Sequence, residues 1–331
     1  MIAGIVSLTL AQQAGTVGPW WLELSRYLPY PALLVPAVVA LLISCRLGWR
    51  WVVASGIALA LVLVFAMGFA WGRPDVKRDG DVPLRFMTYN IKAYKAALRP
   101  DGFAELAREV ARQAPDILVA QDSYGPYRKD EAAGMWPDGR AFGMPYSFAA
   151  GQYVVASRYP VRACSSGSID QRNQVHSYVR CVVDVNGVEL NVVTVHFESP
   201  RNGLNAARRE GFDGVEDWEQ NYEDRLGQSR ALARDLQANG ARPLIVAGDL
   251  NAPEASSVVR TLLAGGLRDA FSSASRGYGF SYGHALRLGF SFLRIDHVLV
   301  SPEVGVANVF VGGAQASEHR PVIADLLLHP R

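Results

Sequence analysis

The chain has 331 residues, more than one ordinary hydrophobic core needs, and a formal net charge of +2 at pH 7. Residues 1–72 contain only Glu23, Arg26, Arg46 and Arg50 as charges, which leaves 30 of the 33 basic and 30 of the 31 acidic residues for the rest of the chain. This neutrality counts against a protein that binds duplex nucleic acid mainly through the phosphates, because such proteins carry an excess of basic residues. A local basic patch remains compatible with it.

Two apolar stretches near the N-terminus predict a membrane hairpin. Residues 51–71 are uncharged, long enough to cross a hydrocarbon core of roughly 30 Å, and bounded by tryptophans, which prefer the membrane interface. Residues 29–45 form a shorter uncharged stretch that starts at Pro29 and carries Pro31 and Pro36, compatible with a kinked span or a re-entrant segment; we favour a span. A buried core helix is the alternative for each stretch. Residues 1–10 are too short to span and predict a surface stub or the remnant of a longer helix.

The orientation of this hairpin depends on opposing signals. The two arginines in the connection at 46–50 place it in the cytoplasm, whereas the basic residues at 73–78 argue the opposite. Cys164 and Cys181 fall on successive strand-like runs, and in a hairpin their sulfur atoms could form a disulfide, which is typical of exported proteins. We therefore expect a multi-pass inner-membrane protein with an extracytoplasmic soluble domain.

After a polar linker at residues 73–83, residues 84–331 predict an α/β (α+β) domain. Short apolar or alternating runs predict strands at 84–91, 116–120, 152–157, 161–168, 178–185, 188–196, 244–247, 294–301 and 321–328. Helical periodicity predicts helices between Asp101 and Pro115, over about 218–237 and over 256–263. Loops are predicted at residues 123–150, 198–204 and 272–291, and the last of these loops is expected to lie over the site. Strands outnumber helices, which favours two stacked mixed sheets flanked by helices.

The most informative stretch is the apolar run Leu244–Ala247, which predicts a buried strand. Gly248 ends it, and Asp249 and Asn251 follow with one residue between them. Alternate residues of an extended chain point the same way, so a carboxylate and an amide lie side by side at a strand end. An Asx-turn that closes the strand is the structural alternative.

Polar residues recur where other predicted strands end. Taken singly, an asparagine there is more often a turn former, an aspartate a solvated loop acid, and a histidine a core residue. Together they supply carboxylates, carboxamides and imidazoles, the material of a phosphate-transfer site that uses a hard metal such as Mg²⁺ or Mn²⁺ rather than zinc on thiolates. The residues are Asn90, Asp122, His196, Asp249, Asn251, Asp296, His297, Glu318 and His319.

In this order the motifs resemble those of the endonuclease/exonuclease/phosphatase superfamily, over about residues 84–328. They are Met-Thr-Tyr-Asn90-Ile, Val-Ala-Gln-Asp122, Thr-Val-His196, Gly-Asp249-Leu-Asn251, Arg-Ile-Asp296-His and Ser-Glu318-His319-Arg-Pro. That group includes deoxyribonuclease-like nucleases, apurinic endonucleases, neutral sphingomyelinases and inositol polyphosphate phosphatases. The resemblance implies a four-layer α/β sandwich and hydrolysis of phosphoesters.

The resemblance places Asn90, Asp122 and Glu318 at a divalent cation, Mg²⁺ or Mn²⁺, which binds phosphate oxygen and steadies charge on the leaving group. Two of these positions depart from the family, which usually has Glu where Asp122 stands and Asp where Glu318 stands. Each change keeps the charge and alters the reach by one methylene. The site could therefore survive with an adjusted backbone, or the chain could have become a binding module with impaired activity.

The same resemblance implies the catalytic roles. Asp249 orients and deprotonates the attacking water, and Asn251 contacts the phosphate. His196 donates to a phosphoryl oxygen. His319 pairs with phosphate or acts as acid–base, while Asp296 holds its ring in the useful tautomer.

We add Arg201 and Arg294 as phosphate contacts, because a planar guanidinium suits phosphate geometry. A structural ion pair is the alternative for each arginine.

The sequence thus predicts a membrane-anchored, metal-dependent phosphodiesterase or phosphatase, with a lipid head group as the favoured substrate. A nuclease of extracytoplasmic DNA or RNA is the next choice within the enzyme class. No motif decides between phospholipid and nucleic acid, and no obligate protein partner is evident.

Overall fold

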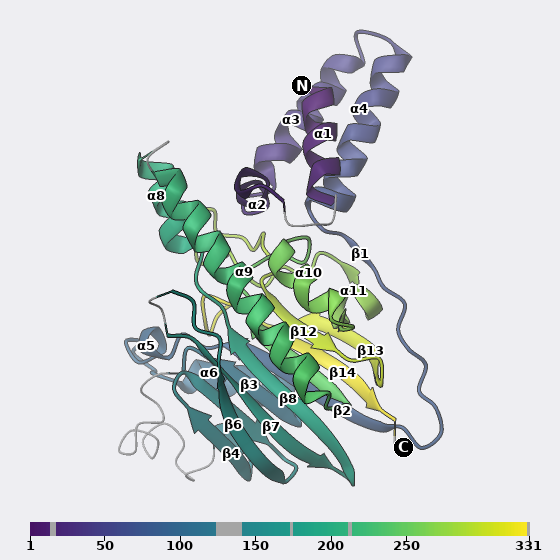
Figure 1. Cartoon of the computed structure of the whole chain (residues 1–331). Helices are drawn as coiled ribbons and strands as arrows, with labels where there is room; N and C mark the ends of the chain where they lie inside the picture. Colours follow the sequence, from purple (N-terminus) through teal and green to yellow (C-terminus); the bar gives the residue numbers. More distant parts are fainter. Residues whose placement is uncertain (14–17, 124–140, 173–174, 211–213, 330–331) are drawn as a thin grey trace.

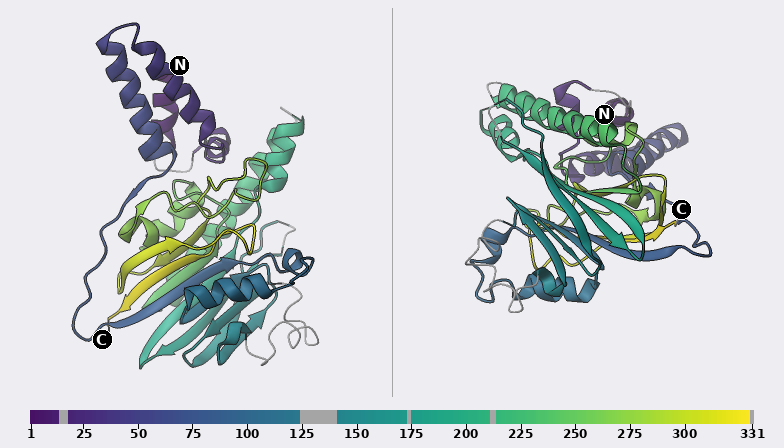
Figure 2. Two further views of the ribbon diagram at one scale, coloured as in Figure 1. Left: turned by 180° about the vertical axis from the view of Figure 1, so that it is seen from behind. Right: turned by 60° about the horizontal axis from the view of Figure 1, so that its bottom comes forward.

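Two six-stranded β-sheets lie face to face at the centre of the molecule (Figures 1 and 2). The structure, a computed structural model, describes residues 1–13, 18–123, 141–172, 175–210 and 214–329. The first sheet has the order β13–β14–β2–β3–β5–β4, with β2 Val82–Asn90, β3 Ile117–Gln121, β4 Tyr146–Ala150, β5 Tyr153–Ser157, β13 Val304–Val311 and β14 Val322–Leu328. The second has the order β10–β12–β9–β8–β7–β6, with β6 Val161–Ser168, β7 Ser177–Val185, β8 Val188–His196, β9 Leu244–Asp249, β10 Arg268–Asp269 and β12 Asp296–Val300.

The central strands are buried on both faces, which explains their nearly continuous apolar sequences. On β9, Ile245 belongs to the core between the sheets, whereas its neighbour Val246 packs into the layer under α9 and α10. On β3, Val119 and Leu118 divide in the same way between the central core and the layer under α6. The helices of these outer layers are α6 Ala104–Gln113, α9 Gly214–Asn239 and α10 Ser257–Ala264. The α/β fold class with helix-flanked mixed sheets is confirmed.

Several elements differ from the predicted ones. The edge strands β4 and β13 were not predicted, and β4 lies in a predicted loop whose residues 124–140 are outside the described part of the chain. Two helices, α8 Arg201–Glu210 and α11 Ala270–Ala274, overlap the loops predicted at 198–204 and 272–291. Helix α8 packs on α9, and a Cβ at Gly203 would lie 2.9 Å from the Trp218 Cα, so this glycine permits the close approach of the two helices.

The N-terminal helices form a bundle that stands apart from the sheets (Figure 1). It contains α1 Ile2–Gln13, α3 Pro31–Ser44, and α4 Trp49–Leu61, which continues as a π-helical turn, η1 Val62–Ala66. Within the described part of the chain, one helix, Trp49–Ala66, is long and apolar enough to cross a membrane, whereas α3 has 14 residues. The two-span hairpin therefore stays a prediction.

The helix that contains the second predicted span ends before residue 71. The helix ends before Gly68, whose φ of 71° is left-handed, and the chain then forms the short strand β1 Ala70–Trp71. This strand pairs with β11 Arg276–Gly277 of the α/β domain. The following residues, expected as a polar linker, continue along the domain: the amide of Gly72 donates to Ser275 and that of Asp75 donates to Val306.

A second connection joins the helical region to the domain through α2 Trp20–Ser25 and the turn after it. The buried carboxylate of Glu23 accepts hydrogen bonds from the Ser256 hydroxyl at 2.9 Å and from the Ser257 amide at 3.1 Å, at the start of α10. The hydroxyl of Tyr27 donates to the backbone carbonyl of Asn251 at 2.7 Å. Burial raises the pKa of Tyr27 to about 12, so the hydroxyl keeps its proton. Residues 20–27 lie in the predicted membrane region, yet they pack on the α/β domain.

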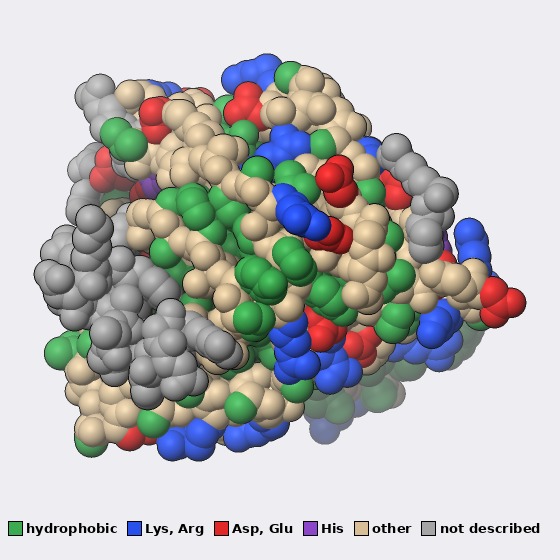
Figure 3. Space-filling model, turned by 90° about the horizontal axis from the view of Figure 1, so that it is seen from below, with side chains coloured by type: hydrophobic (Ala, Val, Ile, Leu, Met, Phe, Trp, Pro, Cys, Tyr) green, Lys and Arg blue, Asp and Glu red, His purple; other side chains and the backbone are tan. Residues whose placement is uncertain are grey.

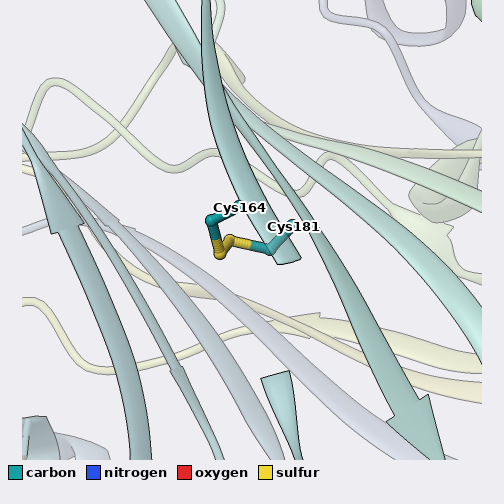
Figure 4. The surroundings of a disulfide bond; sticks show 2 residues. All are labelled: Cys164 and Cys181. Carbon is teal, nitrogen blue, oxygen red and sulfur yellow. A yellow bond between two sulfur atoms is a disulfide. The ribbon is translucent and has the colours of Figure 1, made fainter. Parts of the chain in front are cut away.

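Cys164 and Cys181 form a disulfide across the antiparallel pair β6–β7 (Figure 4). The two cysteines are opposite each other in the strand register, and their Cα atoms are 4.1 Å apart. The hairpin predicted from the sequence is present, and it brings the sulfur atoms together.

The surface opposite the N-terminal helices carries acidic and basic side chains interspersed with apolar and uncharged ones (Figure 3). Partly exposed ion pairs such as Arg85–Asp325 and Arg158–Asp116 join opposite charges on the domain. This interspersed pattern agrees with the neutral composition of residues 73–331.

Replacing Glu23 with alanine is expected to destabilise the protein. The change leaves the buried guanidinium of Arg26 and the start of α10 without their carboxylate partner. Loss of one member of a buried ion pair costs about 3–5 kcal/mol, so we expect the unfolding midpoint of the detergent-solubilised full chain to fall by roughly 5–15 °C. Glu216→Ala, at an exposed position of α9, is the control. Equal midpoints for the two variants would contradict docking of α2 on the domain.

Candidate active site

The polar strand ends predicted from the sequence converge at one end of both sheets. In the parallel pair β8–β9, His196 lies opposite Asp249, and in the antiparallel pair β12–β9, Asp296 lies opposite the same residue. Asn90, the last residue of β2 in the other sheet, donates from Nδ2 to Asp249 Oδ2 at 2.9 Å. The helices that follow these strands, α5 Ala93–Ala96 and α8, lie at the same end of the domain in both views (Figures 1 and 2).

The carboxylate of Asp249 is fully buried and surrounded by nitrogen atoms. Its Oδ1 accepts the backbone N–H of Asn251 at 2.9 Å, while Oδ2 faces Nε2 of His196 at 3.4 Å and Nε2 of His319 at 3.6 Å. Gly248, the residue before Asp249, has no side chain that could clash with the neighbouring strand: a Cβ at this position would lie 1.8 Å from the Val195 carbonyl oxygen of β8. The glycine therefore lets β9 approach β8 closely enough to align Asp249 with His196.

His319 is held on its other ring nitrogen by Asp296, with Nδ1 3.0 Å from Oδ2. The hydroxyl of Ser281 donates to the same carboxylate at 2.7 Å, and the ring of Tyr282 packs against the imidazole at a centroid distance of 4.7 Å. Burial alone would lower the pKa of His319, but the negative charges of Asp296 and Asp249 outweigh it and the pKa is raised. The site thus favours an imidazolium whose Nε2 points toward Asp249.

A group of ion pairs lies beside the hydrogen-bonded pair of His319 and Asp296, which we call the dyad. Asp122 pairs with the ammonium of Lys92, and its Oδ1 is 3.9 Å from Nδ1 of His196. Burial would raise the pKa of Asp122, but His196 and Lys92 outweigh it, so the pKa is lowered. The backbone at Asp122 is left-handed, with φ 51°.

Glu318 pairs in the same way with the ammonium of Lys95, and its Oε2 is 3.5 Å from the Arg201 guanidinium. Burial would raise the pKa of Glu318, but Lys95 and Arg201 outweigh it and the pKa is lowered. Arg201 also donates to the Tyr282 hydroxyl at 3.1 Å.

The three residues predicted at a cation supply hard oxygen donors, a carboxamide and two carboxylates. Within the described part of the chain, Oε2 of Glu318 is buried and makes no hydrogen bond, although the Arg201 guanidinium lies 3.5 Å away, so this oxygen keeps lone pairs for a cation. Asn90 already uses its amide nitrogen on Asp249, which leaves Oδ1 as the donor atom for a cation. These residues therefore fit a hard divalent ion.

A second set that could hold a metal ion consists of Asp249, Asp296 and His319, whose ligand atoms lie within 4.8 Å of one another. Within this set Asp296 and His319 are hydrogen-bonded to each other.

Arg294 is a correction to the predicted phosphate contacts. Its guanidinium is buried, donates to Asp269 at 2.9 Å and pairs with Glu254, which is the structural ion pair given as the alternative. His297, the neighbour of Asp296, also points away from the dyad: its Nδ1 lies 2.7 Å from Asp269 and its Nε2 2.9 Å from the Ala252 carbonyl oxygen. The strand alternation of β12 explains this separation of Asp296 from His297.

Sequence reasoning missed four residues at the site. Lys92 and Lys95 follow the Asn90 motif directly, so their spacing could have attracted attention, but lysines in a turn are usually solvated. Ser281 and Tyr282 come from an irregular segment whose sequence shows no periodicity. Their positions depend on the isolated bridges of Tyr282 to Leu293 and to His319.

A family model described as "Endonuclease/Exonuclease/phosphatase family" matches residues 87–319. The chain belongs to the endonuclease/exonuclease/phosphatase family. The match contains all of the predicted site residues, from Asn90 to His319. Family members are hydrolases of phosphoesters, among them nucleases and phosphatases, and generally depend on a divalent metal. No curated protein sequence matches the chain significantly.

Solved structures of this family share the fold. Sphingomyelinase C from Streptomyces griseocarneus is 21% identical, with a TM-score of 0.53 over 74% of this chain and 99% of its own. A mannosyl-6-phosphatase from Bacteroides thetaiotaomicron is 15% identical, with a TM-score of 0.53 over 73% and 99%. A 3'-5' exonuclease from Neisseria meningitidis is 20% identical, with a TM-score of 0.50 over 73% and 98%. At these identities the likeness establishes the fold.

Replacing Asp296 with asparagine is expected to shift the alkaline limb of the rate profile. The pKa of His319 lies above its ordinary value of 6.5 because of Asp296 and Asp249, so the imidazolium persists above that pH. Removing one of these charges should move the alkaline limb of kcat/KM to lower pH. The measurement is the pH dependence of kcat/KM on a chromogenic phosphodiester. If the alkaline limb is the same in Asp296→Asn as in the unchanged protein, ionisation of His319 does not set that limb.

Proposed function

We propose that the protein is a divalent-metal-dependent hydrolase of phosphoesters anchored to a membrane. The observation that carries this proposal is the arrangement around Asp249, a buried carboxylate fixed by Asn90 from the opposite sheet and faced by His196 and His319. A carboxylate held in this way is suited to take a proton from water, and an imidazolium beside it is suited to give one to a leaving oxygen.

In this proposal Asp249 orients the attacking water and accepts its proton. His319, kept protonated and oriented by Asp296, donates its Nε2 proton to the leaving oxygen. Asn251 donates one amide hydrogen to the Phe197 carbonyl at 2.9 Å, which fixes the side chain and leaves the second for a phosphoryl oxygen. His196 and Arg201 supply further donors at the edge of the site.

Asn90, Asp122 and Glu318 would hold the divalent ion, Mg²⁺ or Mn²⁺. Bound there, such an ion supplies Lewis-acid stabilisation of charge on the phosphoryl group.

A lipid head group is the favoured substrate. The N-terminal helices expose large apolar side chains, among them Leu42 at 65% and Trp49 at 72%, as expected of helices in contact with lipid. The helices contact the domain through α2 and β1, which keeps the domain near the membrane surface. The disulfide supports an extracytoplasmic domain, because such bonds persist in oxidising compartments. A sphingomyelinase C with this fold indicates that the fold accommodates a lipid phosphodiester.

A nuclease of extracytoplasmic DNA or RNA is the second candidate, since an exonuclease shares the fold. The neutral composition and the interspersed surface charges count against a duplex substrate.

Alanine at Asp249 or His319 is expected to abolish hydrolysis. Each change removes a proton-transfer group, which typically costs about 10²–10⁴-fold in rate. The measurement is hydrolysis of bis-p-nitrophenyl phosphate by the purified full chain with Mg²⁺ or Mn²⁺. Asp217→Ala, at an exposed position of α9, is the matched control. Equal rates for all variants would refute a catalytic function and leave a binding module.

The substrate class is tested with the full chain in vesicles that contain sphingomyelin or a glycerophospholipid, compared with single- and double-stranded oligonucleotides. We expect head-group release at a rate at least about tenfold above phosphodiester cleavage in the oligonucleotides, since the anchor raises the local concentration of lipid. The reverse ratio would favour the nuclease.

A further inference from the structure

Two lysines contact the carboxylates that are predicted to bind a metal ion. Lys92 and Lys95 are three residues apart at the turn of α5, and each pairs with a different carboxylate, Lys92 with Asp122 and Lys95 with Glu318. The Lys92–Asp122 interaction is not a peripheral surface pair, because the two side chains are only 14% and 12% exposed, whereas the Lys95 side chain is 38% exposed. A long cationic side chain held at such low exposure needs a specific partner.

The backbone of Lys92 also contacts the site. Its φ and ψ of 45° and 53° are left-handed, a conformation that non-glycine residues rarely adopt, and Asp122, across the site, is left-handed as well. The amide of Lys92 donates to Oδ1 of Asn90 at 3.3 Å, which is the atom that would face a metal ion. Both the backbone and the side chain of Lys92 therefore contact groups assigned to the cation.

The charges around the Lys92 ammonium also connect it with the groups assigned to the cation. Two carboxylates, Asp122 and Asp249, act on the Lys92 ammonium, and both favour its charged form. An ammonium is a compact cation with three N–H donors, so it can occupy a position between oxygen ligands much as a small metal ion does. With Lys92 in place, Asp122 is already neutralised.

We propose that Lys92 is a resident cation of the active site and competes with the divalent metal for Asp122. This proposal rests on the proposed function, because it concerns the same ligands. A metal ion can use Asp122 only after the Lys92 ammonium has moved away from it, so the free energy of that displacement weakens metal binding. Once displaced, the ammonium remains within reach of the site and is available to a phosphoryl oxygen of the substrate.

The test is direct binding of Mn²⁺ to the full chain in detergent without substrate, followed by calorimetry and by the electron paramagnetic resonance signal of free Mn²⁺. Lys92→Met is expected to tighten Mn²⁺ binding at least about tenfold, because it removes a positive charge in contact with a ligand carboxylate. Lys77→Met, the same substitution at an exposed position before β2, is expected to bind as the unchanged protein does. Equal or weaker binding by Lys92→Met would overturn the proposal.

Lys92→Gln guards against a folding defect, since it keeps a hydrogen-bond donor near Asp122 while removing the charge. It should also tighten Mn²⁺ binding, and Asp122→Asn should weaken binding in each background. If Lys92→Gln and Lys92→Met both bind no better than the unchanged protein while their unfolding midpoints are normal, the competition does not exist. Tighter binding without any hydrolysis would support Lys92 as the competing cation and count only against the proposed function.

Discussion

The hydrogen bond from Asn90 to Asp249 joins the two sheets at the point where the chemistry is expected, and the rest of the site depends on it. Asn90 ends a strand of one sheet and Asp249 ends a strand of the other. A second buried bridge, from Gln121 of β3 to Thr194 of β8 at 2.9 Å, fixes the same ends of the sheets one layer deeper. Because each sheet supplies half of the polar groups, the packing of the apolar core between them sets the distances in the site. Changes in that core should therefore affect catalysis without touching a polar residue.

The site is crowded with charge, and its buried and half-buried acids have basic partners. Asp296 has His319, Asp122 has Lys92, and Glu318 has Lys95. Buried carboxylates are costly unless they are paired. The same pairing that permits their burial also decides how readily a metal ion or a phosphate can enter. The two positions that depart from the family pattern, 122 and 318, are also the two carboxylates that Lys92 and Lys95 contact.

The sequence predicts the centre of the fold better than its edges. Strands such as β9 are apolar throughout and end in polar residues, so both the strand and the site residue are visible in the pattern. Edge strands such as β13, which contains Gly305 and a bulge near Asn308, lack that pattern and are stabilised by pairing with β14. Arg294 shows a further limit: a guanidinium near site motifs suits phosphate and carboxylate equally, and only its buried partners Asp269 and Glu254 decide between them.

The contact of Tyr27 with the carbonyl of Asn251 has a mechanical consequence. The domain is fastened to the N-terminal helices at two separate places, at residues 20–27 before α3 and at β1 after α4, so both ends of the helical segment are fixed to it. A domain attached in this way cannot rotate freely on a single tether. In a bilayer its catalytic end would keep one tilt and one height above the lipid, and the depth at which a scissile bond lies would become a criterion for selecting substrates.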